Sequence, residues 1–356
     1  MREYSKRVMG LDLGDRWSHY YVINERGESE EQGRVMTTVS GLEKRLRGEE
    51  RCLVVIEAGT HSPWVSRLVE ECGQDVVVAN PRKVALIAAN QSKGDRVDAE
   101  LLARLVRADV KLLHPIRHRG KEAQGDLGVI RARDVLVRAR GRMVNHVRGV
   151  AKSMGARLVG CTAGSFARKA SEQIPETLSE ALAPLLAMVE IMTQQIGKYD
   201  RQIEGLCRER YPETELLRQV TGVGAVTSLA YVLTLEDPHR FLQSRSVGSF
   251  LGLRPGQDQS GEQDPELPIT KAGDGLLRRL LVQSAQYILG PFGPDCDLRR
   301  WGLKLASRGR KNAKKRAVVA VARKLAVLLH RLWVNGEVYE PFYSDRSSSK
   351  SQAVSA

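Results

Sequence analysis

The chain has 356 residues, 42% hydrophobic and 28% charged, which is enough for two or three domains with sizeable cores. No apolar run approaches the ~20 residues of a membrane-spanning helix, and the N-terminus lacks a signal-peptide layout. The five cysteines are scattered and form no CxxC pair, which argues against disulfides or a cysteine zinc site. We therefore expect a cytoplasmic protein with no membrane association, and the net charge of +14 predicts a polyanionic partner.

The first third of the chain alternates between strand and helix patterns. Residues 7–39 contain three short strand patterns, with a turn at 24–27 between the last two. A helix at 41–48, a buried strand at 51–59, a helix at 63–72, a strand at 75–79 and helical segments within 81–109 follow. The order β-β-β-α-β-α-β-α is that of the ribonuclease-H-like topology. We expect an α/β ribonuclease-H-like (RuvC-like) domain over residues 1–115.

Residues 116–214 have few glycines and prolines and show apolar residues at helical spacing. This pattern predicts two long helices, packed as a coiled-coil arm, with a turn between residues 155 and 175. A third, mostly helical domain is expected over 215–343, with a Gly/Pro-rich insert at 253–268, a helix at 273–289 and a basic helix at 313–333. The polar residues 344–356 are typical of a disordered tail.

The third domain contains two features that suit nucleic acid. The segment TGVGAVTSLAYVL resembles the hairpin of a helix-hairpin-helix, in which Gly222 and Gly224 would let backbone N–H groups approach a phosphate; a plain helix–helix turn is the alternative. Residues 298–336 contain no acidic residue, and residues 117–157 form a second basic segment. Such clustering is typical of nucleic-acid binders. The candidate phosphate contacts, which a solvated surface would also explain, are Lys271, Arg278, Arg279, Lys314, Lys315 and Arg316.

Four carboxylates are candidates for a metal site. Asp12 lies in an apolar strand and Glu57 ends the run LVVIE, where an ionised carboxylate is costly unless it is paired or metal-bound. In the expected topology the first and fourth strands are neighbours, so both side chains would point at one spot. Asp95 and Asp98 are three residues apart and would share one face of a helix near its N-terminus. Taken alone, Asp95 could instead be a helix N-cap and Asp98 a solvated charge of the first turn. Mg²⁺ (or Mn²⁺) would relieve the repulsion of the set and could serve phosphoryl transfer.

Taken in order, these motifs resemble the DEDD transposases of the one-ten (IS110) family of insertion sequences. The resemblance covers roughly residues 8–110 and 216–340. It rests on GLDLG, IEAGTHSPW and KGDRVDAELLARL, then on TGVGAVTSLAYVL, FLQSRSVGSFLGLRPGQDQSG and ITKAGDGLLRRLL. It implies that Asp12, Glu57, Asp95 and Asp98 are the family's acidic positions and that Ser260, in QSG, is its nucleophile. The acidic stretch at 262–266 departs from the basic character expected after that serine.

The resemblance also implies partners and a reaction. DNA would be cut and rejoined through a phosphoserine link, under the guidance of a non-coding bridge RNA. A homo-oligomer, either a dimer or a tetramer, would bring Ser260 to the acidic cluster within one subunit or between two. From the residues alone, Ser260 reads as a turn serine in a polar loop, and it would need activation by a metal or a remote carboxylate.

Three other functions compete with a transposase or recombinase. A Holliday-junction resolvase-like nuclease would need the carboxylates and a metal, but no serine and no covalent intermediate. An actin-like kinase also begins with GLDLG and a hairpin, but the sequence has no second copy of that domain with its own phosphate loop. A non-catalytic nucleic-acid-binding protein would be handicapped by four acidic residues beside a polyanion.

Overall fold

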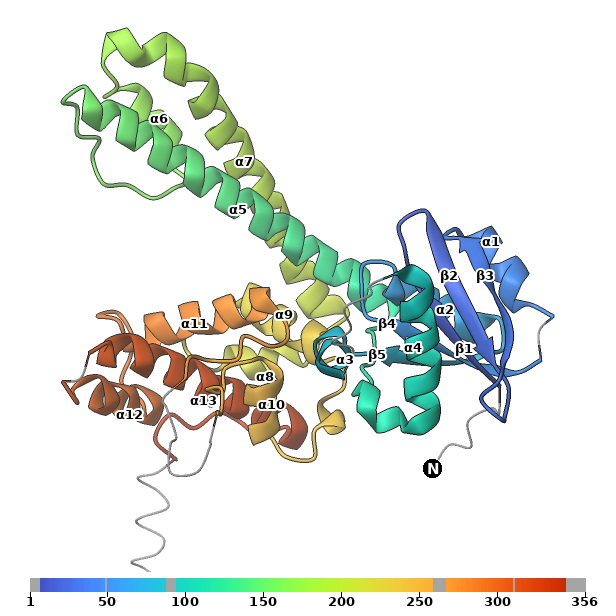
Figure 1. Cartoon of the computed structure of the whole chain (residues 1–356). Coiled ribbons are helices and arrows are strands. Elements are labelled where there is room, and N and C mark those ends of the chain that lie inside the picture. Colours follow the sequence, from blue (N-terminus) through green and yellow to red (C-terminus); the bar gives the residue numbers. More distant parts are fainter. Residues whose placement is uncertain (1–6, 49, 88–93, 259–266, 310, 344–356) are drawn as a thin grey trace, which may run out of the picture. The chain divides into compact units, whose positions relative to one another are not determined.

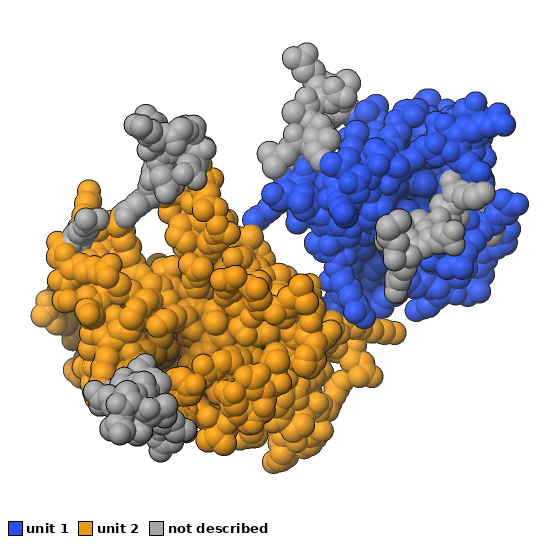
Figure 2. Space-filling model, turned by 90° about the horizontal axis from the view of Figure 1, so that it is seen from below, with its two compact units in different colours: residues 1–119 blue, residues 120–356 orange. Residues whose placement is uncertain are grey.

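The computed structural model describes residues 7–48, 50–87, 94–258, 267–309 and 311–343. Its contacts define two compact units, residues 1–119 and residues 120–356 (Figure 2). None of the described helices is both long and apolar enough to cross a membrane.

The first unit is an α/β domain built on a five-stranded mixed sheet with the strand order β3-β2-β1-β4-β5 (Figure 1). β1 pairs antiparallel with β2 and parallel with β4, so the predicted neighbourhood of the first and fourth strands is confirmed. The strands are β1 (Arg7–Asp12), β2 (Trp17–Ile23), β3 (Ser29–Met36), β4 (Cys52–Glu57) and β5 (Asp75–Ala79). The helices are α1 (Val39–Leu46), α2 (Ser62–Glu71), α3 (Pro81–Ile87), α4 (Asp95–Ala108) and the 3-10 helix η1 (Val110–Leu113).

Helices cover both faces of this sheet, which explains why β1 and β4 are apolar along nearly their whole length. On one face, Met9 and Ile56 pack with residues of α1 and α2. On the other face, Val8 and Val55 pack with residues of α4. β3 is an exposed edge strand, and its charged residues suit an edge that must not pair with other chains.

At Gly10, in the middle of β1, α4 approaches the sheet very closely. A Cβ atom at this position would lie 1.9 Å from the carbonyl oxygen of Ala99 and 2.9 Å from the backbone nitrogen of Ala103. The backbone of α4 therefore lies directly over Gly10, and no larger residue fits there without moving the helix. This contact holds the first turn of α4 near the carboxyl end of β1.

The second unit is helical and begins with two long helices that pack along one another, α5 (Lys121–Ser153) and α7 (Glu176–Glu209) (Figure 1). Near the turn between them, Val147, Phe166 and Val189 belong to a small separate core. The two predicted long helices are thus confirmed. The turn region also contains the short helix α6 (Phe166–Ser171), which the spacing of apolar residues did not predict.

The rest of the second unit packs around one large apolar core. Its centre is α9, in which every residue from Thr227 to Leu235 is buried, as expected for a helix that is apolar all round. Val321 and Leu325, on the predicted basic helix at the end of the chain, are buried in the same core. The elements are α8 (Thr214–Arg218), α9 (Ala225–Leu235), η2 (Pro238–Arg240), α10 (Arg245–Phe250), α11 (Gly275–Leu289), α12 (Asp297–Ala306) and α13 (Ala313–Asn335).

Replacing Gly10 by alanine should destabilise the first unit, because the new Cβ atom must push the α4 backbone off the sheet. We expect a loss of about 1–3 kcal/mol in the free energy of unfolding, measured by chemical denaturation. Gly59→Ala is the matched control, since a Cβ atom there would meet nothing within 4 Å. Equal stabilities of the two variants would show that α4 does not depend on this close approach.

Candidate functional site

Asp12 and Glu57 are the last residues of two neighbouring parallel strands and lie at the same edge of the sheet. Side chains alternate between the faces of a strand, and residues two positions before them, Gly10 and Val55, face α4. Asp12 and Glu57 therefore face α4 as well. Both are half-buried, so their charges are only partly hydrated.

Asp95 and Asp98 occupy the first turn of α4, above the same edge of the sheet. Gly94 is the N-cap residue, so Asp95 is not the cap, and both carboxylates are exposed. Burial raises the pKa of Asp12 from 3.8 to about 6, together with repulsion by Asp98, Asp95 and Glu57. Burial, and then repulsion by Asp98, also raises the pKa of Glu57. The structure thus brings the four acidic residues close enough to repel one another.

This cluster has no cationic partner: in the described part of the chain, no arginine or lysine forms an ion pair with any of the four carboxylates. Elsewhere in the same unit such pairs do form, for example Arg104 with Glu100 at 2.7 Å, also on α4. Half-buried carboxylates without partners are costly, and oxygen donors of this kind suit a hard divalent cation such as Mg²⁺ or Mn²⁺. Among the described residues, however, no three acidic, histidine or cysteine side chains are already arranged to hold one ion. The exposed Asp95 and Asp98 would have to turn inward to complete a site.

His19, which none of the sequence motifs indicated, belongs to the same cluster. It lies on β2 directly opposite Asp12, and its Nδ1 atom is 3.5 Å from Oδ2 of Asp95. It also lowers the pKa of Asp12. The signal was present in the sequence, because a hairpin closing over residues 13–18 places residue 19 opposite residue 12.

The loop after Glu57 is held by the side chains of its own motif, IEAGTHSPW. The buried Ser62 hydroxyl accepts a hydrogen bond from the Gly59 backbone N–H at 2.9 Å and lies 2.8 Å from Nε2 of His118. The Trp64 indole N–H donates to Nδ1 of His61 at 3.1 Å. These bonds give the motif a structural task, which is to fix the chain where it leaves the acidic end of β4.

Ser260 lies outside the described residues, as does the stretch 259–266 around it, but the stem of its loop is well defined. Backbone hydrogen bonds join Gly256 N–H to the Pro268 carbonyl and Thr270 N–H to the Arg254 carbonyl, both at 2.9 Å. At the foot of the stem, Gly252 has a φ of +67°, and a Cβ atom there would lie 2.2 Å from the backbone nitrogen of Ala272. Glycine is therefore required at position 252, and the loop rises from a fixed base.

Two of the three basic residues next to this loop, Arg278 and Arg279, already have protein partners. One guanidinium nitrogen of Arg278, Nη1, donates to the carbonyl oxygens of Leu251 at 2.9 Å and Ala272 at 2.7 Å, which braces the foot of the stem. Arg279 pairs with Asp134 of α5 at 2.6 Å. Lys271 is exposed at the edge of the stem. In the structure, Arg278 thus braces the foot of the stem, and Arg279 joins α11 to α5.

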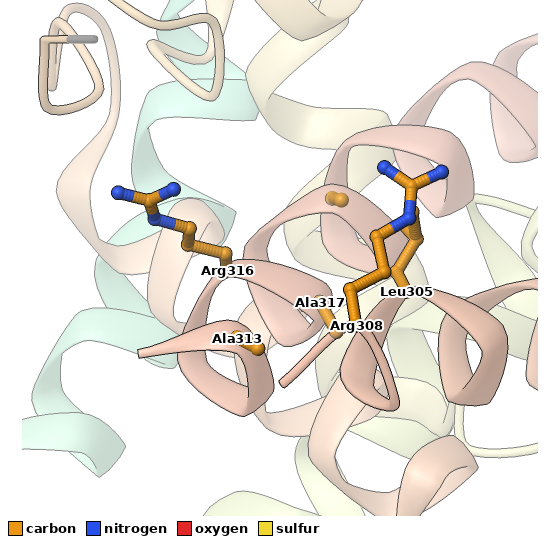
Figure 3. A pocket seen from close by; sticks show the side chains of 6 residues that line it. Leu305, Arg308, Ala313, Arg316 and Ala317 are labelled. Atoms are coloured by element: carbon orange, nitrogen blue, oxygen red, sulfur yellow. The ribbon is translucent and has the colours of Figure 1, made fainter. Parts of the chain in front are cut away.

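A further basic feature of the second unit lies where α12 ends and α13 begins. An open hollow of about 470 Å³ is lined by Leu305, Arg308, Ala313, Arg316, Ala317 and Ala320. The guanidinium groups of Arg308 and Arg316 stand on either side of it, with the small Ala313 and Ala317 between them (Figure 3). Lys314 and Lys315 are exposed on the same first turn of α13, which contains no acidic residue.

Two family models match the chain. One, described as a transposase and named for DEDD and IS110, matches residues 9–155, and the other, described as "Transposase IS116/IS110/IS902 family", matches residues 214–295. The chain is also similar over most of its length to individual transposases. It is 26% identical to the transposase for insertion sequence element IS1111A of Coxiella burnetii, covering 94% of this chain and 91% of that protein. It is 28% identical to a probable family 20 transposase of Pseudomonas aeruginosa (82% and 86%) and 27% identical to the transposase for IS1328 of Yersinia enterocolitica (79% and 84%).

The raised pKa of Asp12 predicts how stability depends on pH without metal. The folded state holds this proton up to about pH 6 and the unfolded state only to about 3.8, so stability should fall as pH rises through that window. Asp12→Asn should therefore stabilise the metal-free protein by about 1–2 kcal/mol near neutral pH, after allowance for solvent screening, and by little near pH 4. Thermal unfolding in chelator measures both values.

The fully exposed Asp15 supplies the control for this measurement, since Asp15→Asn should give no comparable stabilisation near neutral pH. If Asp12→Asn shifts the melting temperature equally at both pH values, Asp12 is not destabilised by its neighbours.

Proposed function

Because this chain belongs to the IS110 family of transposases, we propose that it cuts and rejoins DNA strands with Asp12, Glu57, Asp95, Asp98 and Ser260. The observation that carries the proposal is the convergence of four carboxylates, with no arginine or lysine partner among the described residues. All four fall within the segment that matches the DEDD transposase model, and Ser260 falls within the segment that matches the second model. The strand order and the pairing of β1 with β4 support a ribonuclease-H-like (RuvC-like) assignment for the first unit.

Transposases of the DEDD type use divalent metal ions, and the donor set of the acidic cluster suits Mg²⁺ or Mn²⁺. Asp12 and Glu57 would supply the fixed, half-buried ligands, whereas Asp95 and Asp98 would turn in from the first turn of α4. When bound, such ions stabilise charge on the attacking and leaving oxygens of a phosphodiester. The role of Gly10 is then to let α4 come close enough for its two carboxylates to reach the site.

Ser260 would be the nucleophile. Its Oγ atom forms a bond to phosphorus while the bond from phosphorus to the leaving strand oxygen breaks; the hydroxyl proton is released and the leaving oxygen takes up a proton. One phosphoester replaces another, so the energy is kept, and a hydroxyl of a second strand end can later displace the serine. The rigid stem supports this role, because Arg278 and Gly252 fix both ends of the loop that carries the serine.

The basic surface of the second unit would bind the nucleic acid, both DNA and a guide RNA. Cations in the first turn of a helix oppose the helix dipole, so the set Lys314, Lys315 and Arg316 is unfavourable by itself. A backbone phosphate held between Arg308 and Arg316 would remove this conflict. We further propose a cytoplasmic homo-oligomer, in which the long helices α5 and α7 form a coiled-coil arm.

The covalent link distinguishes this function from that of a resolvase-like nuclease, which has the carboxylates but uses water. Ser260→Ala should keep Mn²⁺ and nucleic-acid binding yet lose both the protein–DNA adduct and recombination. The measurement is a denaturing gel with labelled DNA, and Ser153→Ala, an exposed serine at the end of α5, is the matched control. An adduct in the Ser260→Ala protein would make the serine assignment wrong. DNA nicking without any adduct in the unmodified protein would favour the nuclease.

Nucleic-acid affinity should depend steeply on salt, because each neutralised DNA phosphate contributes about 0.9 to the slope of log affinity against log salt. Replacing Lys314, Lys315 and Arg316 by glutamine should lower that slope by about 2–3, as measured by fluorescence anisotropy. The control removes the same charge at three exposed positions elsewhere: Arg26, Lys44 and Lys198. Equal slopes for the two triple variants would mean that the first turn of α13 does not contact phosphate.

A further inference from the structure

His19 is placed by the sheet at the centre of the acidic site. Antiparallel pairing puts it opposite Asp12, and the neighbouring residues on the same side of β2, Tyr21 and Ile23, belong to the core under α4. His19 therefore faces α4, as Asp12 and Glu57 do. Its side chain is 29% exposed, so it remains partly accessible beside the carboxylates.

The Nδ1 atom of His19 is buried and has no hydrogen-bond partner among the described residues. Leaving a buried polar atom without a hydrogen bond is costly, so a partner is expected to be close. Oδ2 of Asp95 lies 3.5 Å away, just beyond a charge-assisted hydrogen bond of about 2.7–2.9 Å. The Asp95 side chain is 71% exposed, and in the described structure His19 is its one side-chain partner.

A small rotation of Asp95 towards His19 would satisfy both groups. A carboxylate accepts hydrogen bonds only, so the ring nitrogen that faces it must carry a proton. Any form of the ring that carries a proton on Nδ1 can donate this hydrogen bond. One oxygen of Asp95 would then be held by His19, and the other would be left for the ion.

We propose that His19 is a positioning residue of the acidic site, whose Nδ1–H holds the Asp95 carboxylate turned towards Asp12. This inference rests on the proposed role of the cluster in binding a divalent cation. Donors that orient a metal-binding carboxylate typically change metal affinity about 10–100-fold when they are removed.

Substituting His19 by asparagine or by glutamine tests the two ring nitrogens separately. The amide nitrogen of asparagine takes the place of Nδ1, whereas that of glutamine takes the place of Nε2. Mn²⁺ affinity of the full chain, measured by calorimetry without DNA, should fall about 10-fold or more in His19→Ala and His19→Gln. His19→Asn should stay close to the unmodified protein, and His146→Asn, at an exposed histidine of α5, is the matched control.

The loss of Mn²⁺ affinity in the His19 variants must also depend on Asp95. Once Asp95→Asn has been introduced, His19→Ala should cause little further loss of Mn²⁺ affinity, because the two residues act through one contact. Additive losses, or retention by glutamine instead of asparagine, would overturn the inference. Thermal unfolding of each variant separates a loss of metal affinity from a loss of folded protein.

Asp12→Asn separates this inference from the proposed function. If Asp12→Asn abolishes Mn²⁺ binding while His19→Ala binds normally, the metal site stands and only the role of His19 is wrong. If the unmodified protein does not bind Mn²⁺, both proposals are wrong.

Discussion

The close approach of α4 to β1 at Gly10 is the constraint on which the acidic site depends. Two of its four carboxylates lie at the ends of two neighbouring strands, and the other two lie on a helix. Only a helix whose backbone contacts the sheet brings these two pairs together. Gly10 permits this contact, because any side chain would occupy the space of the Ala99 carbonyl oxygen. Gly10 lies two residues before Asp12 on the same strand. This residue without a side chain thus decides where Asp95 and Asp98 lie.

Electrostatics gives the acidic site and the basic surface opposite characters within one chain of net charge +14. Burial, and then repulsion by the neighbouring carboxylates, keeps the pKa of Asp12 high, so the ionised cluster is under electrostatic strain. The first turn of α13 carries the converse strain, since its cations face the positive end of a helix dipole. Metal ions would relieve the first strain and phosphates the second, and a phosphodiester substrate with its ions brings both.

The arginines of the second unit show that a basic residue near a functional loop can have a structural task. Arg278 binds the carbonyl oxygens of Leu251 and Ala272, and Arg279 pairs with Asp134, so both contribute to the base from which the serine loop rises. Arg308 and Arg316 instead flank an open hollow with small side chains between them. The arginines of this unit thus stand in two different settings: Arg278 and Arg279 brace the base of a loop, whereas Arg308 and Arg316 flank an open hollow.

The sequence by itself determined the order of the elements, because hydrophobic periodicity is a local signal, and the expected topology correctly predicted that β1 and β4 are neighbours. The four carboxylates were also selected from the sequence, and their role in a metal site stays a prediction. Ser260 stays a prediction from motif resemblance, since it lies outside the described residues. The tertiary structure decided what no local pattern contains. Strand register places His19 opposite Asp12. Helix packing over Gly10 brings Oδ2 of Asp95 to 3.5 Å from Nδ1 of His19. The partners of Arg278 and Arg279 are likewise backbone carbonyls and a carboxylate that only folding brings near, so their charge alone could not show what they bind.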